Sequence, residues 1–157
     1  MAIIVELTSP NGWPADEDRK AIGIQSFVIP GTSSKIACAK DVAAILVAFC
    51  AEFHDLIEPI DEGQLDDWGY AFRMTRGSDK VLSNHSSGTA VDLNALKHPL
   101  GKSNTFTKDQ TNTIQLLLVK YGLAWGGNYK KRKDEMHFEI AMTKTQVQNK
   151  LKQLGLK

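Results

Sequence analysis

Two short motifs, far apart in the chain, restrict the fold more than any other feature of the sequence. The first runs from Ser83 to Asp92 and includes His85, and the second runs from Asp134 to His137. Two imidazoles and one carboxylate form a common ligand set for catalytic zinc, because they leave the fourth tetrahedral position open for water. We therefore expect His85, Asp92 and His137 to bind one Zn²⁺, which requires a fold that brings the two motifs together.

The residues around the first motif predict a turn followed by a strand. Gly88 suits a tight turn, and the residues after it alternate as they would in a strand. On such a strand Ala90, Asp92 and Asn94 share one face, while the apolar residues between them point toward the core. A lone histidine or aspartate is usually a cap or a solvated residue. Here the second motif supplies the missing ligand and a base, which favours a metal site.

The second motif offers two candidates for a general base. On a regular strand His137 shares its face with Glu135 and Glu139, so periodicity favours Glu135. Asp134 follows a loop and precedes the regular strand, where a period of two does not apply. Glu139 would then be able to orient an imidazole, as metal-bound histidines usually require.

An arginine upstream of the first motif could stabilise negative charge at the site. The segment from Tyr70 to Met74 alternates as a strand, which would carry Arg73 toward the metal. A planar guanidinium suits bidentate contacts to a substrate carboxylate or to the oxyanion of a tetrahedral intermediate. The competing interpretation is a surface ion pair, and Arg76 is the alternative arginine.

The remaining patterns predict an α+β fold. Apolar residues recur with helical spacing from Ala37 to Ile57, and capping-box patterns at Thr107 and Thr143 open two later helices. Strands are expected at 25–29, 70–74, 89–93 and 136–141. We expect a small antiparallel sheet that carries the zinc site, with helices packed against it, in a single domain spanning residues 1–157.

Composition and charge limit the classes of function. The 157 residues, 42% of them apolar, fit one domain, and a net charge of +1 lacks the basic excess of nucleic-acid binders. Residues 1–7 are apolar but too short for a signal peptide or a membrane span. Cys38 and Cys50 would lie roughly 18 Å apart in one helix and could not form a disulfide, which suggests synthesis in a reducing cytoplasm.

The two motifs resemble those of zinc peptidases that cut bacterial cell-wall peptides, namely the D-alanyl-D-alanine carboxypeptidases and the phage L-alanyl-D-glutamate endopeptidases. The phage branch is the more similar. Further segments look like endolysin peptidase domains of phages that infect actinobacteria: Tyr70-Ala71-Phe72-Arg73, His98-Pro99-Leu100-Gly101 and Trp125-Gly126-Gly127-Asn128-Tyr129.

The resemblance implies a zinc-dependent hydrolase that cuts the peptidoglycan stem peptide between L-alanine and D-glutamate. It implies Asp134 as the base, with Glu135 as the alternative, and it favours Arg73 over Arg76. It also implies that His98 belongs to a cleft wall and is not a ligand. The competing functions are a D-alanyl-D-alanine carboxypeptidase and, as in hedgehog-type relatives, a zinc-containing wall-binding module without catalysis. The acid at Asp134 argues against the last.

The same resemblance shapes our expectations about partners and location. We expect a monomer that binds peptidoglycan, and neither nucleic acid nor insertion into a membrane. Such a protein would be made in the host cytoplasm without a signal peptide and would act on the bacterial cell wall.

Overall fold

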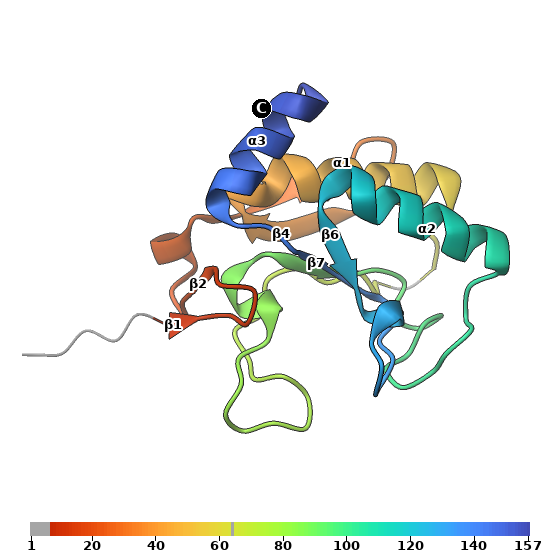
Figure 1. The fold of residues 1–157 in the computed structure, drawn as a ribbon, viewed down its shortest axis with the longest axis horizontal. Coiled ribbons are helices and arrows are strands. Elements are labelled where there is room, and N and C mark those ends of the chain that lie inside the picture. The colour runs from red at the N-terminus through yellow and green to blue at the C-terminus, as the bar shows by residue number, and fades with distance from the viewer. Residues whose placement is uncertain (1–6, 64) are drawn as a thin grey trace, which may run out of the picture.

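The computed structural model describes residues 7–63 and 65–157, which form a mixed α/β fold with small antiparallel sheets (Figure 1). The α-helices are α1 (Lys40–Leu56), α2 (Lys108–Tyr121) and α3 (Lys144–Leu154). The strands are β1 (Leu7–Thr8), β2 (Pro14–Ala15), β3 (Ile24–Val28), β4 (Lys35–Ala39), β5 (Ala90–Asp92), β6 (Leu123–Trp125) and β7 (His137–Ile140). Three short 3-10 helices complete the elements: η1 (Arg19–Ile22), η2 (Asn84–Ser87) and η3 (Gly126–Asn128).

The central sheet has three antiparallel strands in the order β5-β7-β6. In its register Asp92 lies opposite His137, and Val91 lies opposite Phe138. β7 is therefore the middle strand, and it delivers the end of the second motif directly beside the end of the first. The strand expected at 136–141 is confirmed in this position.

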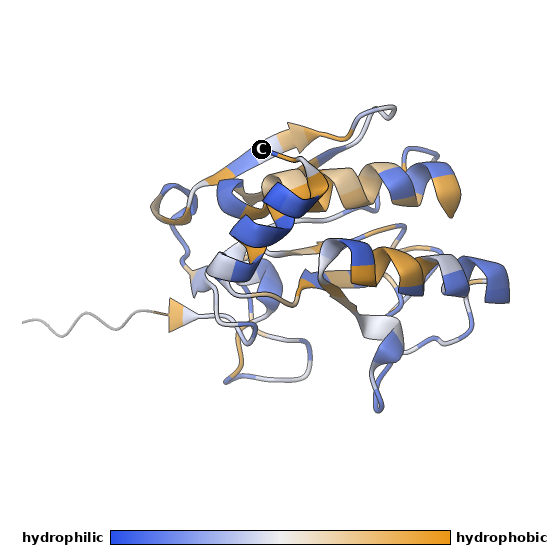
Figure 2. Ribbon diagram, turned by 45° about the horizontal axis from the view of Figure 1, so that its top comes forward, coloured by the Kyte–Doolittle hydropathy of each residue, from blue (hydrophilic) through white to orange (hydrophobic). Residues whose placement is uncertain are grey.

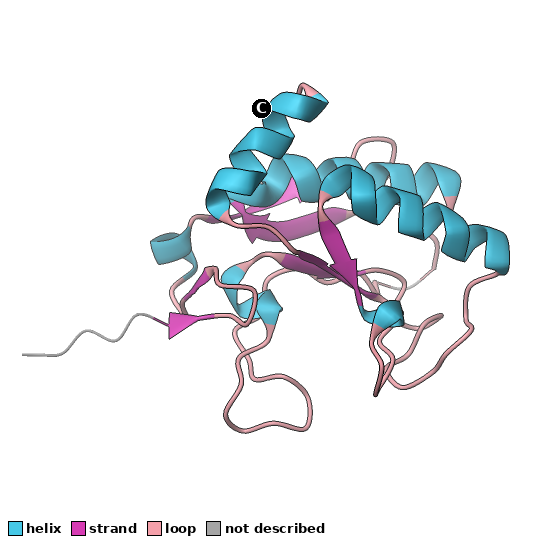
Figure 3. Ribbon diagram, in the orientation of Figure 1, coloured by secondary structure: helices cyan, strands magenta, loops and turns pink. Residues whose placement is uncertain are grey.

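Helices cover one side of the central sheet, and long loops lie on the other side (Figure 3). The core between sheet and helices is built around Phe138, whose ring centroid lies 4.8 Å from that of Phe49 and 5.7 Å from that of Phe53, both on α1. All three side chains are fully buried. Accordingly α1 is coloured mainly hydrophobic along its central turns in Figure 2, whereas α3 is mainly hydrophilic. The functional motifs lie on the loop side.

The longest helix begins later than its apolar spacing indicates. Residues 37–39 belong to β4, where they pair with β3, so the helix expected from Ala37 starts at Lys40. Cys38 consequently lies in a strand and Cys50 in a helix, and the separation argued from one helix is wrong. Both thiols are buried and form no disulfide.

The two later helices follow their local sequence signals closely. Thr107 and Thr143 each accept a hydrogen bond from the backbone three residues on, and a glutamine side chain completes each capping box. Gly122 and Gly155 end the helices in the left-handed conformation that favours glycine.

The strand expected at Tyr70–Met74 is wrong. This segment is extended, but its backbone groups bond to different elements instead of one neighbouring strand: Tyr70 N donates to Ala37 O in β4, and Ala71 N donates to His85 O in η2. Alternation in the sequence predicts an extended chain and cannot specify a partner. The segment therefore acts as a bridge between β4 and η2.

Residues 7–15 form hydrogen bonds with the first motif and with the end of β7. The hydroxyl of Ser9 donates to Ser87 Oγ at 2.7 Å. The Asn11 amide donates to Thr89 Oγ1 at 2.8 Å and to Ile140 O at 2.9 Å. The N-terminal hairpin of β1 and β2 thus ties the end of η2 to β7.

Residues 1–6, which include most of the apolar N-terminal stretch, lie outside the described residues. Among the described residues, no helix has the length and apolar composition that a membrane crossing requires.

The turn at Gly88 gives a direct test of how the fold holds the first motif. Gly88 has φ +69°, and a Cβ there would lie 2.3 Å from Ile24 Cδ1 and 2.7 Å from Ala39 N. We expect Gly88→Ala to lower the free energy of unfolding. Holding alanine in the left-handed conformation costs about 1–2 kcal/mol, and the clash of its Cβ with Ile24 and Ala39 lowers the stability further. Urea unfolding measures this loss.

Gly155→Ala is the matched control. Gly155 has φ +67° with nothing within 4 Å of its added Cβ, so it carries the same backbone cost without a clash. Equal destabilisation in the two variants would contradict the proposed close packing of Gly88.

Candidate metal centre

Three side chains from the two motifs converge beneath the central sheet. His85 lies in η2, Asp92 ends β5 and His137 begins β7, and all three are buried. One ligand atom from each lies within 4.8 Å of the others. Asp92 Oδ1 is 3.1 Å from His85 Nε2 and 3.1 Å from His137 Nδ1. This is the donor set and the spacing that a tetrahedral zinc ion requires, with one position left open.

The outer nitrogen of each imidazole is held by the protein. His85 Nδ1 lies 2.7 Å from Gly69 O, so it donates there and leaves Nε2 as the lone-pair nitrogen. His137 Nε2 lies 3.4 Å from Glu139 Oε1, which also accepts from the hydroxyl of Tyr129 at 2.7 Å. Both rings are therefore oriented with a lone pair toward Asp92, and Glu139 has the orienting position expected from the sequence.

The charges around the triad favour a bound cation. Burial alone would raise the pKa of Asp92, but when the two imidazoles are protonated, the hydrogen bonds from His137 and His85 and their positive charges hold it well below its usual range. Burial alone would lower the pKa of His137, but Asp92 and Glu139 raise it to about 10. Two buried carboxylates on either side of one imidazole thus create a pocket of negative potential, which a divalent metal ion would satisfy.

Asp134 lies next to the triad and precedes β7, so the period of the strand does not govern its direction. Burial raises the pKa of its carboxyl, and the negative charge of Asp92 raises it further. Its Oδ1 is buried and has no hydrogen-bond partner among the described residues. A buried carboxylate oxygen without a donor is suited to accept a proton or a hydrogen bond from a molecule in the site.

Glu135 points away from the triad. It is buried, and its carboxylate accepts hydrogen bonds from Asn104 N, Thr105 N and Thr105 Oγ1 at 2.8–2.9 Å. Its backbone carbonyl accepts from Trp125 Nε1 at 2.8 Å. Glu135 therefore anchors the loop at residues 104–105 and shares no cavity with the metal triad.

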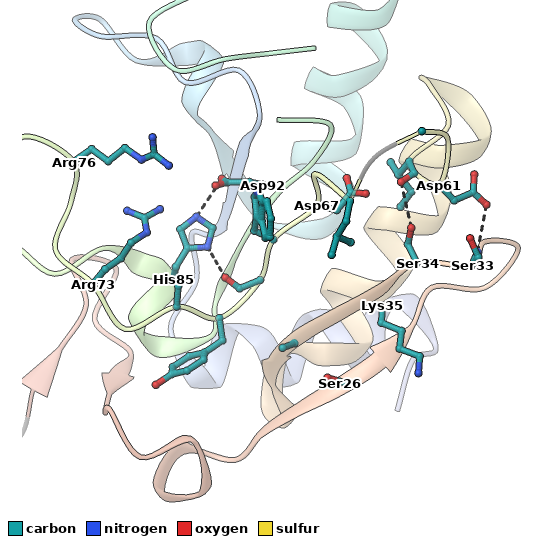
Figure 4. Close-up of a pocket in the computed structure, with 18 residues that line it drawn as sticks. Ser26, Ser33, Ser34, Lys35, Asp61, Asp67, Arg73, Arg76, His85 and Asp92 are labelled. Carbon is teal, nitrogen blue, oxygen red and sulfur yellow. Dashed lines mark hydrogen bonds and ion pairs between the residues drawn. The ribbon is translucent and has the colours of Figure 1, made fainter. Parts of the chain in front are cut away.

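Two cavities meet at the triad, and both are lined by His85 and Asp92. The Asp134 cavity, of about 470 Å³, also contains His137, Tyr129 and Arg132 in its wall. The Asp67 cavity, of about 690 Å³, is the one shown in Figure 4. A chain bound across the triad would have room on both sides of it.

Arg73 and Arg76 line both cavities. In Figure 4 the two guanidinium groups lie on the same side of His85. Arg73 is half-buried and Arg76 is exposed. Among the described residues neither arginine takes part in an ion pair, so both are available to a ligand.

Other residues singled out in the sequence take structural places. Trp125 is buried in the core, whereas Tyr129 lines the Asp134 cavity. His98 stacks on Phe106 with ring centroids 3.7 Å apart and pairs with Glu58. It does not belong to the group formed by His85, Asp92 and His137.

The acidic segment at residues 61–67, before Trp68, has the sequence pattern of a solvated connection, and this expectation is wrong for two of its acids. In the structure Asp66 and Asp67 are each only 6% exposed. Trp68 exchanges two backbone hydrogen bonds with Asp92, each 2.8 Å long. A tryptophan directly after two acids, where solvated loops rarely carry one, was the available signal.

Comparisons with known proteins give one match. Residues 76–140 match a family model described as D-alanyl-D-alanine carboxypeptidase. The match contains both motifs and Arg76, and it begins after Arg73. No curated protein and no solved structure matches the chain.

Asp67 predicts an unusual dependence of stability on pH. Burial raises its pKa to about 6 from 3.8, so between these values the folded chain keeps a proton that the unfolded chain releases. Its contribution to stability is present at low pH and is lost as the pH rises through 6. We expect Asp67→Asn to stabilise the fold at neutral pH by roughly 1–3 kcal/mol and to have little effect below pH ~4.

Urea unfolding at both pH values checks this expectation. Asp66→Asn is the matched control, because Asp66 is equally buried and adjacent in the chain. An equal gain in the control would contradict the assignment, since it would reflect the loss of any acidic charge and not the particular burial of Asp67.

Proposed function

We propose that this chain is a zinc peptidase that hydrolyses the stem peptide of bacterial peptidoglycan, and that it cuts between L-alanine and D-glutamate as a phage endolysin. The observation that carries the proposal is Oδ1 of Asp134, which has no hydrogen-bond partner in the described part of the chain and lies beside the converged triad of His85, Asp92 and His137. The match of residues 76–140 supports a peptidoglycan peptidase in general. The resemblance of the motifs to phage endopeptidases supports the more specific activity.

The proposed ligands of the metal are His85 Nε2, Asp92 and His137 Nδ1. Zn²⁺ bound there would supply a Lewis acid that lowers the pKa of a water to about 7 and polarises the scissile carbonyl. Gly69 O and Glu139 keep the two imidazoles in the required orientation. Both would thus support the site through the imidazoles and not as ligands of the metal.

Proton transfer is assigned to Asp134. Its Oδ1 accepts a proton from the attacking water and later delivers it to the leaving amine, so one group acts as base and then as acid. The raised pKa of its carboxyl brings it closer to neutrality, where such an exchange is efficient. Arg73, with Arg76 as the alternative, would stabilise the oxyanion of the tetrahedral intermediate, and both arginines line the same cavity as Asp134.

The two cavities favour cleavage of an internal bond. A carboxypeptidase needs room for a single residue on the leaving side, whereas an endopeptidase must hold chain on both sides of the scissile bond. His85 and Asp92 line both cavities, of about 470 and 690 Å³, so a bound peptide could extend in two directions from the triad. D-alanyl-D-alanine carboxypeptidase remains the second candidate, because the matching family model carries that description.

Zinc content tests the ligand set. If His85, Asp92 and His137 are the whole protein shell, His137→Ala should lose nearly all bound zinc in elemental analysis. The control is His54→Ala, in the last turn of α1 and outside the proposed ligand set, which should keep one zinc per chain. Full zinc occupancy in the His137 variant would contradict the assignment of His137 as a ligand.

Two amide variants distinguish Asp134 from Glu135. Asp134→Asn keeps size and removes the proton acceptor, so zinc should stay bound while peptidoglycan hydrolysis falls by about 100-fold or more. Glu135→Gln should do far less, because Glu135 serves the loop at residues 104–105.

The two measurements, zinc content and turnover, are made side by side on both variants. A larger loss of turnover in Glu135→Gln would show that the base had been misassigned. Loss of zinc in Asp134→Asn would assign that residue to the support of the metal and not to proton transfer.

The bond itself is identified by mass spectrometry of digested wall fragments. A new N-terminus on D-glutamate is the expected product. Release of D-alanine from an otherwise intact stem would establish the carboxypeptidase instead.

A further inference from the structure

The Asp67 cavity has basic side chains at one end and acidic side chains at the other. Arg73 and Arg76 lie on one side of His85, whereas Asp67 and Asp61 lie on the other side (Figure 4). Its wall includes Asp61, Asp67 and Trp68, and it reaches the metal ligands His85 and Asp92. Trp68 is 48% exposed although its backbone is paired to Asp92. A buried acid and an exposed tryptophan are therefore neighbours in the chain, and the tryptophan is paired directly to the proposed metal ligand Asp92.

Asp67 is buried, and within residues 7–63 and 65–157 no basic side chain forms an ion pair with its carboxylate. Its Oδ1 accepts from Asn94 N at 2.8 Å, and among the described residues no donor reaches Oδ2, although the residue lines the cavity. The charged groups that act on it are Asp66, Asp61 and Glu58, all acidic. Lys35, Arg73 and Arg76 also line the cavity. In Figure 4 the ammonium of exposed Lys35 is directed away from Asp67, and both guanidinium groups lie on the far side of His85.

A second metal ion does not fit this cavity. Hard divalent cations take six or more oxygen ligands in close convergence. Among the described residues, the group of histidine, cysteine or acidic side chains that converges on one point is the triad of His85, Asp92 and His137. The acids around Asp67 are too dispersed, and an aromatic face is no ligand for such an ion.

An alkylammonium group does fit. It needs one or two carboxylate oxygens as acceptors, and its charge is further stabilised by the face of a tryptophan within reach. Asp67, Asp61 and Trp68, which all line the Asp67 cavity, supply these groups. Arg73 and Arg76, at the opposite end of the same cavity, and Arg132 in the Asp134 cavity offer partners for carboxylates.

We propose that the Asp67 cavity binds the side-chain ammonium of the diamino acid in the peptidoglycan stem, and so selects stems in which that amine is free. This inference rests on the proposed function. It also fixes the direction of the bound peptide, because the amine enters the Asp67 cavity while the carboxylates of the stem face the arginines.

Synthetic stem peptides test the proposal. One contains lysine at the diamino-acid position, and the other contains Nε-acetyl-lysine, which has the same length and no charge. The measured quantity is the ratio of kcat/KM for the free over the acetylated peptide. For the wild-type chain we expect a ratio of roughly 10 or more, the usual worth of one charge-assisted hydrogen bond.

Asp67→Asn should bring this ratio close to one. It keeps the acceptor for Asn94 N, and Asp61→Asn serves as a second variant should the first fail to fold. Asp66→Asn is the matched control, since Asp66 lines neither cavity and should keep the wild-type ratio. An unchanged ratio in both Asp67→Asn and Asp61→Asn would overturn the proposal.

The failure of the proposed function gives a different pattern. In that case the wild-type chain cleaves neither peptide, and calorimetric binding of the two peptides to the same chain then decides. Tighter binding of the free-amine peptide, lost in Asp67→Asn, would support the cavity assignment alone. Equal binding of both peptides would overturn it.

Discussion

The pairing of β5 with β7 is the constraint on which the site depends. Its register sets Asp92 opposite His137 and Val91 opposite Phe138. A slip by one residue would turn every side chain of β7 to the other face, so the ring of Phe138 would leave the core and the imidazole of His137 would enter it. The aromatic contacts of Phe138 with α1 therefore hold the register, and the register holds the metal ligands.

Features with a local physical cause are predictable from the sequence. The capping boxes at Thr107 and Thr143 satisfy backbone groups within one turn, and the structure contains both. The three proposed ligands are recognisable because their residue types and spacings carry the chemistry. The choice between Asp134 and Glu135 depended on where a strand begins, and β7 begins only at His137.

Features fixed by distant partners are not predictable in this way. Alternation from Tyr70 to Met74 indicates an extended chain, but its hydrogen bonds go to β4 and η2, which the alternation cannot specify. Asp67 reads as a solvated acid because nothing near it in the sequence announces that Asn94 N and the wall of a cavity will enclose it. The acidic side of the site is consequently visible only in three dimensions.

The N-terminal hairpin gives the site a boundary wider than its motifs. Ser9 and Asn11 bond to Ser87, Thr89 and Ile140, so residues from the first tenth of the chain brace both halves of the metal centre. The segment that matches the family model begins only at residue 76. Grafting that segment alone onto another scaffold would transfer every proposed ligand but not the N-terminal residues whose hydrogen bonds keep the ligands aligned. The smallest transferable unit of this centre is therefore much longer than the segment by which it is recognised.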